Sequence, residues 1–180
     1  MTVFIIILSI LLWLAALAAL FRRQLYAPAL GYFGLLVLSF ARQNGYPLLP
    51  VSDSMLWGWL AITVVVMMAV VLQPVSVRAD NRGMGYMAGG AITGLAVGLL
   101  GFTFSADIGM LYAIMIVAVA AGVFLGFLLY SRTPRGAVFA PSKGMFFRYL
   151  LAKGFPTAIT VMQIGVALVL AIALNKFVTR

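Results

Sequence analysis

Long apolar stretches recur along the whole chain, and they restrict its fold more than any other feature of the sequence. Most of them approach the roughly 20 residues that a helix needs to cross the hydrocarbon core of a bilayer. They lie at residues 3–20, 26–44, 55–72, 84–104, 108–130 and 156–174. Because 65% of the 180 residues are hydrophobic and only 8% are charged, one small soluble core could not bury them. The sequence therefore predicts an all-α, polytopic integral membrane protein, with a single transmembrane domain of about six helices over residues 1–180.

The second stretch is the weakest of the six. Its clearly apolar part, residues 26–40, contains Pro28, Gly31 and Gly34. At about 1.5 Å per residue, a helix of that length rises roughly 22 Å, which is less than the hydrocarbon core of roughly 30 Å. It spans the membrane if the helix extends through Asn44. If it instead forms a re-entrant hairpin with the first stretch, the chain crosses five times.

Basic residues gather in alternate loops of this expected topology. Nine of the 12 Lys and Arg residues lie in the loops that follow the first, third and fifth stretches. The positive-inside rule then puts these loops in the cytoplasm and both termini outside, and a bacterial inner (cytoplasmic) membrane is the expected location. A net charge of +9 would suggest nucleic acid in a soluble protein. Here the charges flank apolar spans, so the expected partners are anionic lipid headgroups and no nucleic acid.

Residues 131–155 form the most basic connection and are expected to be a cytoplasmic loop. Within it Phe146, Phe147, Leu150 and Leu151 share one helical arc and Arg148 faces away. This pattern predicts a short amphipathic helix in the membrane interface before the last span. An acidic protein partner is the alternative ligand for the loop. Across the chain, the residues expected to meet anionic lipid or a phosphate group are Arg78, Arg82, Arg132, Arg135, Lys143, Arg148 and Lys153.

Several residue types that carry chemistry are missing from the chain. It has no Glu, His or Cys, so thiol nucleophiles, Ser-His-Asp triads and His or Cys metal clusters are excluded, and no metal or cofactor is predicted. The three acids are Asp53, Asp80 and Asp107. Asp53 and Asp107 fall on the same side of the expected topology and are weak candidates for a catalytic pair that shares a proton. The simpler interpretation is that each caps a helix, as Asp80 or Asn81 could at the fourth span.

Small residues recur four apart in three of the apolar stretches. Residues at this spacing share a helix face, and small side chains allow another backbone to approach closely in lipid. The candidate helix-packing residues are Ala15, Ala19, Gly85, Gly89, Gly90, Gly94, Gly98, Ala118, Gly122 and Gly126. Stretches 84–104 and 108–130 are therefore expected to pair as an antiparallel hairpin. More helix faces carry small residues than one hairpin needs, which favours a homo-oligomer or additional membrane subunits.

Three functions remain compatible with the sequence. The favoured one is a noncatalytic membrane subunit or scaffold that assembles through glycine-zipper, GxxxG-type packing. The first alternative is a small channel or carrier for a neutral or weakly polar solute, for which Gln163 is the most polar intramembrane residue. The second alternative is a membrane enzyme that handles lipid phosphates. The spans place no ionisable group at mid-membrane, which disfavours proton-driven transport.

Overall fold

The chain forms a bundle of helices with one very short strand pair. The computed structural model describes residues 2–22, 24–43, 46–49, 51–100 and 108–178. The α-helices are α1 (Thr2–Arg22), α2 (Ala27–Ser39), α3 (Asp53–Val71), α4 (Val75–Ala79), α5 (Met84–Leu100), α6 (Ile108–Ser131), α7 (Met145–Tyr149) and α8 (Phe155–Val178). Two 3-10 turns (Ala137–Phe139 and Pro141–Lys143) and a π-helical turn (Leu150–Gly154) lie between α6 and α8. Strands β1 (Arg42–Gln43) and β2 (Tyr46–Pro47) pair antiparallel. The predicted helical class is confirmed.

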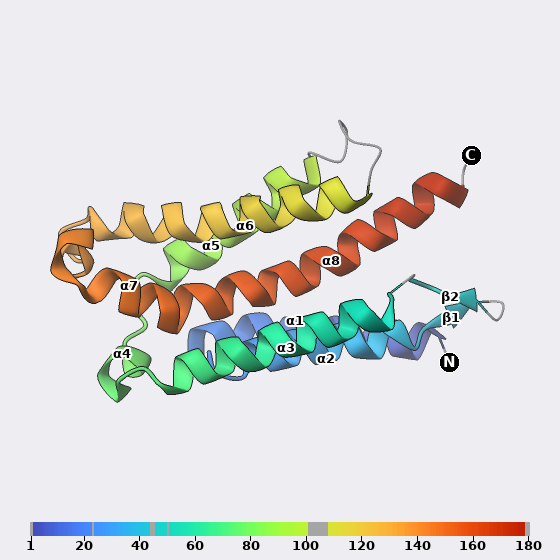
Figure 1. The fold of residues 1–180 in the computed structure, drawn as a ribbon, viewed down its shortest axis with the longest axis horizontal. Helices are drawn as coiled ribbons and strands as arrows, with labels where there is room; N and C mark the ends of the chain where they lie inside the picture. The colour runs from blue at the N-terminus through green and yellow to red at the C-terminus, as the bar shows by residue number, and fades with distance from the viewer. Residues whose placement is uncertain (1, 23, 44–45, 50, 101–107, 179–180) are drawn as a thin grey trace.

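Helix α8 is the central element of the bundle. It lies between the α5–α6 pair and the group formed by α1, α2 and α3 (Figure 1), and it contacts all five of these helices. Within the stretch Met145–Ala171, 72% of the most apolar window is buried, compared with 17% for α1. The buried residues of α8 therefore connect the two groups, whereas α1 exposes most of its apolar surface.

Among the described residues, four helical stretches are long and apolar enough to cross a membrane. They are Thr2–Arg22, Asp53–Val71, Gly109–Ser131 and Met145–Ala171. Helices α2 and α5 are apolar but shorter. Helix α2 ends at Ser39 and the chain continues into β1 at Arg42, so the helix does not extend through residue 44. Six crossings therefore remain a prediction from the sequence.

The two ends of the bundle differ in charge. One end, called the basic end below, is formed by the α1–α2 connection, α4 and α7, whereas the β1–β2 pair and the start of α1 lie at the other end (Figure 1). The basic end carries Arg22, Arg78, Arg82, Arg132, Arg135 and Arg148. The opposite end carries Arg42, Asp53 and, near the end of α8, Lys176. The loops in which the sequence concentrates its basic residues therefore lie at one end of the bundle.

The helix caps differ from those expected. Ser52 is the N-cap of α3, and its hydroxyl accepts a hydrogen bond from the Met55 amide at 3.3 Å, so neither Asp53 nor Ser54 is the cap. Asp80 likewise does not cap α5, because its carboxylate accepts from the Arg82 amide at 2.9 Å, before that helix begins. Ser is as effective at this position as Asp, so composition alone could not distinguish neighbouring candidates.

The expected amphipathic helix before the last span is not a separate element. Helix α7 has five residues and continues through the π-helical turn into α8. Phe146 is buried while Phe147 is 61% exposed, so these two side chains do not share an apolar face. The buried face instead holds Phe146, Tyr149 and Lys153, because it packs on α6 and α4 rather than lying flat on a membrane.

Candidate functional site

Helices α5 and α6 approach so closely that their backbones touch. A methyl group at Gly90 would overlap the carbonyl oxygen of Gly122, and one at Gly94 would overlap the carbonyl oxygen of Ala118. The contact is reciprocal, since a methyl group at Gly122 would overlap the carbonyl oxygen of Gly90. Gly126 lies in the same way against the Tyr86 carbonyl. Glycine is therefore required at these positions for the observed helix separation.

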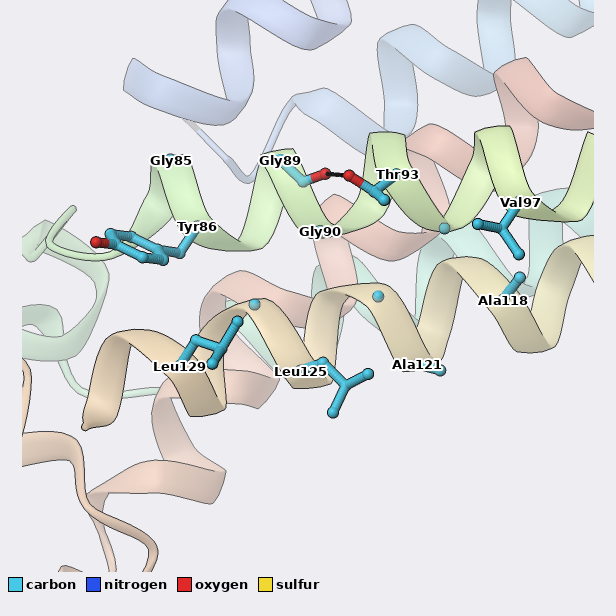
Figure 2. A pocket seen from close by; sticks show the side chains of 13 residues that line it. Gly85, Tyr86, Gly89, Gly90, Thr93, Val97, Ala118, Ala121, Leu125 and Leu129 are labelled. Carbon is cyan, nitrogen blue, oxygen red and sulfur yellow. Dashed lines mark hydrogen bonds between the residues drawn. The ribbon is translucent and has the colours of Figure 1, made fainter. Parts of the chain in front are cut away.

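The same hairpin has an open groove on its outer side. The groove has a volume of about 730 Å³. Figure 2 shows its two walls, with Tyr86, Thr93 and Val97 on α5 and Leu125 and Leu129 on α6. The full lining is Gly85, Tyr86, Gly89, Gly90, Thr93, Gly94, Val97, Ala118, Ala121, Gly122, Leu125, Gly126 and Leu129. Because it extends over residues 85–97 of α5, it is roughly 18 Å long at 1.5 Å per residue.

The groove offers an apolar surface with glycines that the hairpin itself does not need. A methyl group at Gly85 or Gly89 would meet nothing within 4 Å beyond the adjacent backbone of its own helix. The Thr93 hydroxyl lies on this surface but donates to the Gly89 carbonyl at 2.8 Å, so its proton is already used within α5 (Figure 2). The groove is therefore suited to an uncharged occupant that approaches the backbone closely.

The small residues of α1 do not form the centre of its contact with the rest of the described chain. Ala15 is exposed and Ala19 is half-buried, whereas Ala16 and Leu20 are buried against the bundle. The Trp13 indole supplies the close contact between α1 and α2, because a methyl group at Gly34 would overlap its ring. The packing face of α1 is thus one residue away from the face suggested by the alanine spacing.

Gln163 is fully buried in the centre of α8. Its side-chain amide donates to the Thr63 hydroxyl on α3 at 2.8 Å. Its Oε1 atom has no hydrogen-bond partner in the described chain and lies where a side chain at Gly31 of α2 would be. This residue therefore joins three helices. Such an arrangement favours helix-to-helix bonding over contact with a solute.

The three acids do not form a described site. Asp53 is exposed at the start of α3, and Asp107 lies outside the described residues, so their proposed pairing has no geometry to assess. Asp80 is at the basic end and forms an ion pair with Arg82 at 2.7 Å. Partial burial alone would raise the pKa of Asp80, but hydrogen bonds and charge from Arg82 outweigh it, so this pKa lies below its ordinary value.

The basic residues divide into exposed and engaged groups. Arg132, Arg135 and Arg148 are exposed, as lipid contact would require, and the side chain of Lys143 lies outside the described set. The Arg82 guanidinium pairs with Asp80 and lies 5.3 Å from the centre of the Phe139 ring.

Lys153 differs most from expectation. It is 1% exposed, so it cannot serve a lipid headgroup. Its Nζ donates to the Arg78 carbonyl and, at 3.1 Å, to Oδ1 of Asn81. Burial of a charged amine is costly, and these acceptors offset part of that cost.

Asn81 connects three segments that are distant in sequence. Besides accepting from Lys153, its Oδ1 accepts from the side-chain amide of Gln24 at 3.1 Å. Its own amide donates to the Phe21 carbonyl at 3.1 Å. Asn81 therefore joins the α1–α2 connection, the α4–α5 turn and the π-helical turn before α8.

A cluster of aromatic residues also holds the α4–α5 turn in place. Phe127 stacks on Tyr149 with ring centres 5.1 Å apart, and Phe139 lies 4.5 Å from Tyr149. The Tyr149 hydroxyl donates to the carbonyls of Asp80 and Arg82. The connection between α6 and α8 is thus hydrogen-bonded to the α4–α5 turn.

Sequence reasoning missed Gln24, Asn81 and Tyr149 as connecting residues. Each is a polar residue beside a predicted span, which is the available signal, but its partners lie 57 to 72 positions away. Only the fold brings them together.

Comparison with known proteins gives no assignment: no family model, no curated protein and no solved structure matches this chain. Among the described residues, no group of three or more acidic, His or Cys side chains could hold a metal ion. The fold thus defines a class, an apolar helical bundle with four helices of membrane-spanning length.

Proposed function

We propose that this chain is an integral-membrane subunit that assembles with another protein by accepting a transmembrane helix in the outer groove of α5 and α6. The observation that carries the proposal is the exposure of Gly85 and Gly89, where an added methyl group would meet nothing within 4 Å beyond the adjacent backbone of its own helix. Glycine in a helix interior costs up to about 1 kcal/mol relative to alanine. Gly89 is such an interior position of α5, and both it and Gly85 in the first turn, which have no internal packing role, are explained if a second backbone lies against them.

The shape and chemistry of the groove support a helix as its occupant. It runs along the hairpin for roughly three turns, which matches the contact length of two packed helices. The lining has no charged side chain, and of its two hydroxyls Thr93 is bonded within its own helix while Tyr86 lies at one end of the groove (Figure 2), so a partner needs an uncharged contact stripe. A lipid chain would pack on any apolar surface, and unlike a helix it would gain no specific contact from exposed glycine backbone.

The absence of cysteine permits a direct test by site-specific crosslinking. Ala121→Cys places one thiol in the groove on α6, and Ala120→Cys makes the same exchange at an exposed position of that helix outside the groove lining. Both would be labelled in native membranes with a thiol-reactive photo-crosslinker and analysed by mass spectrometry. We expect a discrete protein adduct from Ala121→Cys and little from Ala120→Cys.

The mass of the adduct identifies the partner. An adduct of twice the chain mass means a second copy of this chain, and another mass means a different subunit. Equal adducts from both positions, or only lipid adducts from Ala121→Cys, would contradict the proposal.

A further inference from the structure

We infer that the basic end contains a binding pocket for a phosphate group, formed by the guanidinium groups of Arg22 and Arg78. The pocket lies between the α1–α2 connection and the α3–α4 segment and has a volume of about 300 Å³. Arg22, Gln24, Tyr26 and Arg78 provide its polar lining. Leu25, Val70, Val75 and Ala79 provide its apolar lining. The site is independent of the α5–α6 groove.

The first argument is the charge of the pocket. It is lined by two arginines and no carboxylate. Asp80 is the acid nearest in sequence, and its carboxylate is taken by Arg82 at 2.7 Å. Asp53 lies at the opposite end of α3. The described chain therefore supplies no carboxylate to neutralise these two cations, and an anion from outside would do so.

The second argument is the state of Arg78. Its Nε atom is buried and has no hydrogen-bond partner in the described chain. The backbone here is fixed, because the Arg78 carbonyl accepts from Lys153. A buried cationic donor without an acceptor is unfavourable, so an anion held by the guanidinium would offset the loss of water around it.

The third argument selects phosphate among anions. Guanidinium groups bind phosphate oxygens through paired, charge-assisted hydrogen bonds, and two arginines can address different oxygens of one group. The pocket sits where α1 and α3 end, with Val70 and Leu25 on its apolar side. In a membrane this is the level of the headgroup phosphates. A phosphodiester of a lipid and a free phosphate ester share the required chemistry.

The position of the pocket revises the residues expected from the sequence. Arg78 was expected to bind together with Arg82, but Arg82 is paired with Asp80 and covers Phe139. The structure replaces it by Arg22, which is 56 positions from Arg78 in the chain. The turn bonded through Asn81 and Gln24 holds the two segments together.

The test compares two double variants that remove the same charge. Arg22→Gln with Arg78→Gln removes both guanidinium groups from the pocket. The hydrogen bond from Lys153 to residue 78 is retained, because its acceptor is the backbone carbonyl. Arg42→Gln with Lys176→Gln removes two positive charges outside the basic end and serves as the control. Each protein would be placed in phosphatidylcholine nanodiscs. Binding of short-chain phosphatidylglycerol and of glycerol 3-phosphate would then be measured by native mass spectrometry and thermal shift.

We expect the wild type and the control to bind a probe with affinities within about twofold, and the pocket variant at least about tenfold more weakly, because charge-assisted bonds to both arginines are lost. Binding of the lipid probe alone identifies a headgroup as the ligand, and comparable binding of glycerol 3-phosphate identifies a soluble ester. Equal losses in the two double variants, or no binding of either probe by the wild type, would overturn the inference.

A charge-conserving variant guards against misfolding as the cause. Arg22→Lys with Arg78→Lys keeps both charges but removes the planar fork. We expect it to bind more weakly than the wild type and more tightly than the Gln variant. If this Lys variant bound with wild-type affinity, general charge attraction would suffice. The inference that the two guanidinium groups form a phosphate pocket would then be refuted.

Discussion

At the scale of single residues, buried polar side chains connect elements that apolar packing alone would leave free to slide. Gln163 is the clearest case, because its amide bonds Thr63 on α3 while its oxygen lies against Gly31 on α2. The sequence identified Gln163 as the most polar residue in a span. Its partners could not be predicted, because Thr63 is 100 positions away.

The fit between Gly31 and Gln163 gives a test by double-mutant cycle. Gly31→Ala alone should destabilise the protein by about 1–3 kcal/mol, because the new methyl group collides with the Gln163 oxygen. Gln163→Ala alone should cost roughly 0.6 kcal/mol, typical of a hydrogen bond between membrane helices. The double variant should be more stable than the sum of the two effects, since the collision is gone.

Unfolding in mixed detergent micelles, followed by circular dichroism, measures these energies. If the two energies were strictly additive, the methyl group added at position 31 would not touch the Gln163 side chain.

At the scale of elements, the α5–α6 hairpin shows that identical residues at equal spacing have different roles. Gly90 and Gly94 contact the backbone of α6, whereas Gly85 and Gly89 on the same helix do not. The sequence predicted the pairing of these stretches through small residues. It could not say which glycines face inward, because a run of adjacent small positions covers more than one face of the helix.

The same substitution on the two faces should therefore have opposite effects. Gly94→Ala should destabilise the isolated monomer by about 1–3 kcal/mol, because a methyl group there overlaps the Ala118 carbonyl and forces the helices apart. Gly89→Ala should leave the stability of the monomer unchanged or raise it by up to about 1 kcal/mol through helix propensity. Thermal unfolding of both purified monomers measures the difference. Equal destabilisation by the two variants would contradict the observed packing of the hairpin.

At the scale of the whole molecule, charge separates one end of the bundle from the other. The α4 and α7 end carries six described arginines, while the β1–β2 end carries Arg42, Asp53 and, near the end of α8, Lys176. Since basic loops are retained in the cytoplasm, we expect the α4 and α7 end to lie there.

Cysteine labelling tests this orientation without background from native thiols. Ser54→Cys lies at the β1–β2 end and Ser142→Cys at the basic end, and both positions are exposed. In intact cells an impermeant maleimide should label Ser54→Cys but reach Ser142→Cys only after permeabilisation. The reverse pattern would invert the predicted topology.

The sequence by itself determined the class of this protein and its charge asymmetry. Apolar length and the spacing of small residues are local properties, so they predict helices and the α5–α6 pairing without coordinates. The tertiary structure decided which residues are functional candidates. It buried Lys153, which the sequence placed among lipid contacts, and it brought Arg22 beside Arg78 across a turn bonded by Asn81. These outcomes depend on which segments meet at the end of the bundle, and that information is absent from any single stretch of the chain.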